Sequence, residues 1–200
     1  LSPAQRASTR PDIPLHALCM YEMKDQKCKD AIAALRKHGK RVIIVGDVYG
    51  TGSSRKSATN SVLWHIGDDI PFVPNKRTRG VVLAGIIAPI FLDTFRDAGG
   101  LPIQVEIGEL ETGDEIEIRP TAGELLKNGS VLSRFEFKSN LIPDEFRAGG
   151  RTNLIIGRAL TSRARDYLKL DDSPLFRKPT PIKDSSNGEG ATLVYHCTTI

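Results

Sequence analysis

The chain has 200 residues, 40% of them hydrophobic, and its 28 basic and 24 acidic residues give a net charge of +4. No apolar tract is long enough to cross a bilayer, and the interspersed charges lack the basic–aromatic stripe of strong nucleic-acid binders. Three cysteines without paired spacing, Cys19, Cys28 and Cys197, argue against a disulfide framework and fit a reducing compartment.

The first half of the chain alternates between strand and helix patterns. Residues 1–22 are expected to be extended, because their prolines remove backbone donors. Apolar residues at helical spacing predict a helix over 25–38, and the β-branched run 41–45 predicts a strand buried on both faces. A glycine-rich loop, 47–54, then leads into a helix predicted over 55–66.

A second strand and helix follow, and the pattern then changes. Residues 81–88 predict another buried strand, and Pro89 begins a helix that ends before Gly99. Two successive strand–helix units indicate a parallel sheet. From Leu101 onward, apolar and polar residues alternate as in half-buried strands, with an Asn128-Gly129 hairpin turn. These strands are predicted at 103–107, 115–118, 124–127 and 131–138.

We expect one domain over residues 1–170. A last amphipathic helix is predicted from Leu160 to Leu170, and residues 171–200, which lack periodicity, are predicted to be a linker or disordered tail. The fold class is therefore α/β, with a mostly parallel sheet followed by antiparallel strands.

The chemically informative segment is the loop Gly50–Arg55, between the buried strand and the next helix. Unpaired N–H groups at a helix N-terminus, together with the helix dipole, bind anions, and glycines let the backbone approach a ligand closely. Ser53 and Ser54 add hydroxyl groups, and the Arg55 guanidinium matches a carboxylate. The loop therefore predicts a site for a small anion.

This loop has three competing interpretations. A dinucleotide fingerprint needs a third glycine where this chain has Arg55, and a phosphate loop needs a glycine at the same position. Both nucleotide interpretations are therefore disfavoured. A purely structural role would have Ser53 and Ser54 cap the helix. Capping does not explain a second serine and an arginine in the same turn.

A longer pattern surrounds the loop. Residues 46–64 read Gly-Asp-Val-Tyr-Gly-Thr-Gly-Ser-Ser-Arg-Lys-Ser-Ala-Thr-Asn-Ser-Val-Leu-Trp. Further segments that belong to the same pattern flank this stretch, at 1–4, 10–17, 67–71, 73–77 and 147–151. From Leu1 to about Phe176, the chain resembles the swivel domain of the B-type bacterial aconitases, within the aconitase and isopropylmalate dehydratase superfamily.

The resemblance implies a swivelling β/β/α domain that closes over a catalytic core. Such a domain forms part of an aconitate hydratase, a hydro-lyase of the tricarboxylic acid cycle that interconverts citrate and isocitrate through cis-aconitate. Ser53 then matches the catalytic base, and Arg10, Ser54 and Arg55 match groups that bind substrate carboxylates. The family's [4Fe–4S] cluster is held by three cysteines of another domain, so the cofactor is expected only in the complete enzyme.

The residue types suit that chemistry. Dehydration of a hydroxy acid needs a base at one carbon and a Lewis acid at the neighbouring hydroxyl group. A serine is a weak base unless its alkoxide is stabilised, and the helix N-terminus and Arg55 are the local groups that favour the anion. The expected partners are citrate, isocitrate, cis-aconitate and the cluster-bearing domains of the same enzyme.

Two other functions stay open. The chain has the size of a small complementary subunit of an isopropylmalate dehydratase-like hydro-lyase, although residues 46–64 resemble the B-type aconitases better. A non-catalytic module that binds RNA when the cluster is lost is the third hypothesis, disfavoured by the weak net charge. A basic loop of Lys76, Arg77 and Arg79 is a hypothetical guide for an anionic substrate.

The sequence indicates neither a metal site nor a signal peptide. The four histidines form no HxxxH or HxH pair, so no metal site is expected within this chain. No charged-then-apolar leader follows Leu1, so no signal peptide is predicted. We expect a cytoplasmic location, or a mitochondrial or other organellar one if the source is eukaryotic, and no membrane partner.

Overall fold

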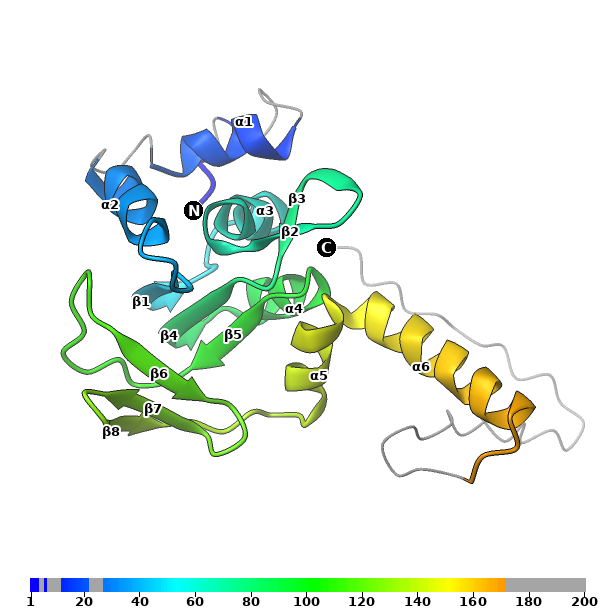
Figure 1. Cartoon of the computed structure of the whole chain (residues 1–200). Helices are drawn as coiled ribbons and strands as arrows, with labels where there is room; N and C mark the ends of the chain where they lie inside the picture. The colour runs from blue at the N-terminus through cyan, green and yellow to red at the C-terminus, as the bar shows by residue number, and fades with distance from the viewer. Residues whose placement is uncertain (4–5, 7–11, 22–26, 172–200) are drawn as a thin grey trace, which may run out of the picture. The chain divides into compact units, whose positions relative to one another are not determined.

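The computed structural model describes residues 1–3, 6, 12–21 and 27–171 (Figure 1). The chain divides into two compact units, residues 1–157 and 158–200, and the boundary falls within the last helix. A domain that ends at residue 170 therefore stays a prediction. The tail predicted from residue 171 lies almost wholly outside the described residues.

The described residues contain six α-helices, one 3-10 helix and eight strands. In chain order they are α1 (Ile13–Ala17), η2 (Leu18–Tyr21), α2 (Lys27–Arg36), β1 (Ile44–Tyr49), α3 (Arg55–Ile66), β2 (Asp68–Ile70), β3 (Val73–Thr78), β4 (Val81–Ile87), α4 (Pro89–Asp97), β5 (Leu101–Gln104), β6 (Ile116–Arg119), β7 (Glu124–Lys127), β8 (Ser130–Arg134), α5 (Leu141–Ala148) and α6 (Arg151–Tyr167).

A three-stranded parallel sheet organises the first unit, in the order β1-β4-β5. In the registers of its strands, Val45 lies beside Leu83, and Leu83 lies beside Ile103. Both β–β crossovers pass through a helix, α3 between β1 and β4 and α4 between β4 and β5. The βαβ pattern predicted from sequence is confirmed, and all three strands end at the same edge of the sheet.

The central strand β4 is buried on both faces. Its residues Val82 and Ala84 pack in one core with side chains of α3 and α4. The alternate residues Val81 and Leu83 pack in a second core with Leu125 of β7 and residues of β5 and α5. Antiparallel sheet, parallel sheet and helices thus form three layers, as Figure 1 shows, and the predicted β/β/α fold class is confirmed.

The antiparallel sheet has the order β6-β7-β8. Asn128 and Gly129 connect β7 to β8 with φ angles of 53° and 77°. Two consecutive positive φ angles match the tight hairpin turn whose twist suits the flanking strands, so this predicted turn is confirmed.

Several elements differ from the expectation. Residues 13–21 are helical rather than extended, because Pro14 lies in the first turn of α1 and Asp12 caps it through Leu15 N–H at 2.7 Å. The β2–β3 hairpin and α5 were not predicted. Helix α6 begins at Arg151 rather than Leu160.

A buried ion-pair network fastens α5 to α4. Glu145 is only 2% exposed, and its carboxylate accepts hydrogen bonds from Arg96 Nε at 2.9 Å and Arg151 Nε at 3.3 Å. Arg96 also pairs with Asp93 at 3.2 Å. The network therefore joins α4, α5 and the start of α6.

Glu145→Gln should destabilise the chain by about 3 kcal/mol, because the largely buried guanidinium of Arg96 loses the buried carboxylate that it pairs with. Glu117→Gln is the matched control, since Glu117 pairs with Arg119 at 2.7 Å on the surface and should lose at most about 1 kcal/mol. Urea titration measures both free energies of unfolding. Equal, small losses in the two variants would show that the Glu145 network contributes no more than a surface pair.

Candidate functional site

The loop 50–54 connects the end of β1 to the start of α3. It therefore lies at the edge where the parallel strands end, the usual place for ligands in open α/β sheets. The start of α4 lies beside it, because Ala88 N–H donates to the Tyr49 carbonyl oxygen at 2.8 Å. Two helix N-termini thus meet near the loop.

Three of the four predicted site residues occupy this loop and the first position of α3. Ser53 is exposed, and Ser54 and Arg55 are half-buried. The Arg55 N–H donates to the Ser53 carbonyl oxygen at 3.0 Å, which tightens the turn before the helix. Arg10, the fourth predicted residue, lies outside the described residues.

Ser54 holds the N-cap position of α3 without capping it through its side chain. Its carbonyl oxygen accepts the first helical hydrogen bond, from Ala58 N–H at 2.9 Å. Because its hydroxyl makes no capping bond, the early amides of α3 are left to other partners. The interpretation of Ser54 as a side-chain cap is therefore wrong.

The Arg55 guanidinium carries no ion pair or side-chain hydrogen bond to any described residue. Arg55 is the first residue of α3, at the positive end of the helix dipole, and directly follows Ser53 and Ser54 in the chain. A cation, early helix amides and hydroxyls in one turn form an arrangement suited to a small carboxylate.

Gly50 fixes the beginning of the loop. Its φ of 79° lies in the left-handed region, and an added Cβ would lie 2.1 Å from Phe91 Cβ. Tyr49 stacks on Phe91 with ring centroids 6.5 Å apart. Gly52 has open space around it instead, with nothing within 4 Å of a Cβ. No local sequence pattern marks Phe91, because its link to Gly50 arises only on folding.

Tyr49 and Trp64 both pack against other side chains. Tyr49 is buried in the core between the sheet and α4, and this burial raises the pKa of its phenol from 10.0 to about 12. Trp64 lies under the guanidinium of Arg77, 4.3 Å from the ring centroid. Asp47 is exposed on β1, and its side chain makes no hydrogen bond or ion pair with a described residue.

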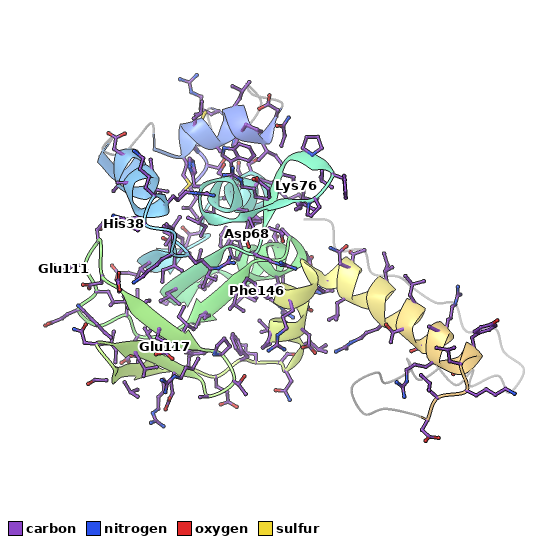
Figure 2. The ribbon with its side chains drawn as sticks, in the orientation of Figure 1. His38, Asp68, Lys76, Glu111, Glu117 and Phe146 are labelled. Atoms are coloured by element: carbon purple, nitrogen blue, oxygen red, sulfur yellow. The ribbon has the colours of Figure 1, made fainter. Side chains whose placement is uncertain are left out.

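The basic residues after α3 lie at the opposite end of that helix from Ser53. Arg77 donates to the carbonyl oxygen of Trp64 and pairs with Asp69 at 2.7 Å. Arg79 donates to the Arg147 carbonyl oxygen at 3.1 Å. Arg77 and Arg79 therefore make contacts within the fold. These contacts give no support to the hypothesis that they guide a substrate. Figure 2 labels Lys76, which lies on the β2–β3 hairpin.

A groove of about 1320 Å³ runs beside β1, away from the loop, and none of residues 50–55 lines it. Its walls come from α2, β1, β6 and the 107–115 connection, and Figure 2 labels His38, Glu111, Glu117 and Phe146 at its border. The groove offers mainly apolar side chains between two sheet edges. We place the candidate site at the serine loop, where hydroxyls, a guanidinium and helix amides converge.

The described residues contain no group of three His, Cys, Asp or Glu side chains that could hold a metal ion. Cys19 is fully buried, and Cys197 lies outside the described residues. A cluster that needs three cysteine ligands therefore does not fit this part of the chain. Among the same residues, no helix is long and apolar enough to span a membrane.

A family model described as the aconitate hydratase 2 N-terminus matches residues 1–189. Aconitate hydratase B of Synechocystis is 56% identical to the chain over 194 residues, which is 96% of this chain and 22% of that protein. Aconitate hydratase B of Escherichia coli is 50% identical over 200 residues, covering 94% of this chain and 23% of the relative. The chain thus spans less than a quarter of the length of these relatives.

A solved structure shares the fold. It is a 3-isopropylmalate dehydratase from Methanocaldococcus jannaschii, with a TM-score of 0.56 and 23% sequence identity. The match covers 82% of this chain and 88% of the other. At this identity, the likeness supports the β/β/α architecture and nothing about the substrate.

Gly50→Ala should destabilise the chain by at least about 1–2 kcal/mol, because alanine is strained at this φ and its Cβ meets Phe91. Gly52→Ala, two positions along the same loop, should change stability by less than about 0.5 kcal/mol. Thermal and urea unfolding of both variants measure the difference. Equal effects would contradict the close contact between Gly50 and Phe91.

Stability at high pH tests the burial of Tyr49. Its pKa of about 12 in the folded chain exceeds the ordinary 10.0, so the folded chain keeps a proton that the unfolded chain releases. The folded state therefore loses stability as pH rises from 10 toward 12. Tyr49→Phe should lose less stability over that range in urea titrations at successive pH values. A wild-type slope in the variant would contradict a buried, protonated phenol.

Proposed function

The chain belongs to the aconitate hydratase 2 N-terminus family, and on this basis we propose that it is the swivel-domain part of an aconitate hydratase. The enzyme would be a hydro-lyase that interconverts citrate and isocitrate through cis-aconitate. The observation that carries the proposal is the serine loop itself, Ser53-Ser54-Arg55 at a helix start that no serine side chain caps, within a family match over residues 1–189.

Ser53 is the proposed base. As an alkoxide, its Oγ takes a proton from the substrate carbon, the C–H electron pair forms the double bond of cis-aconitate, and hydroxide leaves the neighbouring carbon. Hydration on the other side of cis-aconitate runs these steps in reverse, with Ser53 returning the proton. Its exposure makes Oγ accessible to a substrate, and the α3 dipole and Arg55 favour the negative oxygen.

Ser54, Arg55 and Arg10 are the proposed carboxylate-binding groups. A tricarboxylate brings three negative groups, and one must lie near the loop for its carbon to reach Ser53. The Arg55 guanidinium makes no ion pair with a described residue, so a carboxylate that binds it displaces no partner from that part of the chain. Arg10, from the segment before α1, would grip a second carboxylate.

The [4Fe–4S] cluster of the proposed enzyme would belong to a part of the protein beyond these residues, because the described side chains do not fit it. This chain is assigned the proton transfer and the binding of carboxylates. The cluster-bearing domains, citrate, isocitrate and cis-aconitate are its proposed partners, and the cytoplasm its proposed location.

The alternatives rank below this function. A small subunit of an isopropylmalate dehydratase-like enzyme shares the fold, but the solved example is 23% identical, whereas the aconitate hydratase relatives reach 50–56%. RNA binding is disfavoured by the weak net charge of +4. Binding through several phosphate contacts would give an RNA affinity that falls steeply with salt, and a shallow dependence would speak against it.

The test is a chimera in which this chain replaces the matching segment of the Synechocystis relative. We expect it to convert citrate and isocitrate to cis-aconitate, followed by ultraviolet absorbance. Ser53→Ala should lower kcat by about 10²–10⁴-fold, the usual contribution of a positioned base, with little change in KM.

Ser130→Ala is the matched control, since Ser130 is an exposed serine on β8 in the other sheet and should keep wild-type kcat. A folded, cluster-loaded chimera that is inactive on these substrates would contradict the function. Activity on 3-isopropylmalate instead would favour the small-subunit alternative. Wild-type kcat in Ser53→Ala would remove Ser53 as the base.

A further inference from the structure

The serine loop has two anchored ends and a free middle. At its end, Arg55 begins α3, whose residues Ala58, Val62 and Leu63 are buried in the core. Between the ends, Thr51, Gly52 and Ser53 are exposed, and a Cβ at Gly52 would meet nothing within 4 Å. The position of the Ser53 oxygen therefore depends on how the beginning of the loop is held.

That beginning rests on Phe91. A Cβ on Gly50 would lie 2.1 Å from Phe91 Cβ, 2.5 Å from Cγ and 3.0 Å from Cδ1, so the glycine backbone packs directly on this side chain. Phe91 is fully buried and lies between the rings of Tyr49 and Phe95, with centroids 6.5 Å and 5.5 Å away.

A backbone hydrogen bond fixes the same junction. Ala88 N–H donates to the Tyr49 carbonyl oxygen at 2.8 Å, and Leu92 N–H donates to the Ala88 carbonyl oxygen at 2.9 Å as α4 begins. The first turn of α4 thus holds Tyr49 through its backbone and Gly50 through the Phe91 side chain.

We propose that Phe91 is a positioning residue for the Ser53 base, acting through Gly50. The inference deepens the proposed function and rests on it. Phe91 touches no substrate; its ring sets where the backbone leaves β1, and the short path through Thr51 and Gly52 carries that position to Ser53. A displacement of about 1 Å at a reacting group lowers rates by about 10²-fold, so packing beneath the loop matters to the chemistry.

Phe95 provides a matched control within the same helix. It is equally buried, and it also packs on a glycine, because a Cβ on Gly100 would lie 2.2 Å from Phe95 Cε1. Gly100 precedes β5, away from the serine loop. Replacing either phenylalanine by alanine removes a similar amount of core packing, but only Phe91→Ala removes the Cγ and Cδ1 atoms that lie beneath Gly50.

The first readout is NMR relaxation of backbone amides in the full 200-residue chain. Phe91→Ala should lower the order parameters of Thr51 and Ser53 toward about 0.6, the flexible range, whereas Phe95→Ala should leave them near wild type. Phe91→Leu, which keeps Cβ, Cγ and a Cδ atom beneath Gly50, should preserve rigidity. Phe91→Val, which keeps Cγ carbons but no Cδ atom, replaces Phe91→Ala if that variant fails to fold.

The second readout is the kinetics of the chimera described above. Phe91→Ala should lower kcat by about 10–100-fold while KM stays within about twofold, because Arg55 is anchored by α3 rather than by Phe91. Phe91→Leu should keep most of the kcat, and Phe95→Ala should retain it.

Loop order and kcat that respond equally to Phe91→Ala and Phe95→Ala, or to neither, would overturn the proposal. Failure of the proposed function is distinguishable from this result. An inactive wild-type chimera would refute the hydratase assignment, and with it the role of Phe91 in catalysis, whereas the relaxation data would still report whether Phe91 holds the loop.

Discussion

The fold depends on one constraint, the burial of β4 on both faces. Alternate residues of this strand belong to two different cores, Val82 and Ala84 facing the helices and Leu83 facing the second sheet. Because β4 pairs in parallel with both neighbours, each crossover must return through a helix, and both helices start at the same edge. The serine loop lies at that edge for this reason, and its helix amides point where a ligand approaches the sheet.

The same arrangement separates rigid support from exposed chemistry. Tyr49 and Gly50 pack against Phe91 of α4, whereas Ser53, three residues after Gly50, is exposed. A site built this way would hold the proposed base, Ser53, firmly and leave its hydroxyl accessible. That division suits a domain that supplies a base and carboxylate-binding groups to a reaction completed elsewhere, and it agrees with a chain that spans less than a quarter of its relatives.

Sequence reasoning found the features set by local patterns. The βαβ order, the Asn128-Gly129 turn and the chemical content of Ser53–Arg55 follow from periodicity, turn preferences and residue type. Contacts between distant segments were missed, above all the support of Gly50 by Phe91 and the engagement of Arg77 with Trp64. Neither leaves a local pattern, because each depends on how α3 and α4 pack. Pro14 was misjudged since proline also suits the first turn of a helix.

The central claim is that Ser53 meets the substrate carbon from which the proton is taken. A crystal structure of the complete protein with isocitrate bound, in the Ser53→Ala form to prevent turnover, tests it most directly. The account predicts that the substituted side chain faces that carbon, with room for an oxygen about 3–3.5 Å from it, and that Arg55 contacts a substrate carboxylate. A substrate bound away from the loop 50–54, with another side chain facing that carbon, would contradict the account.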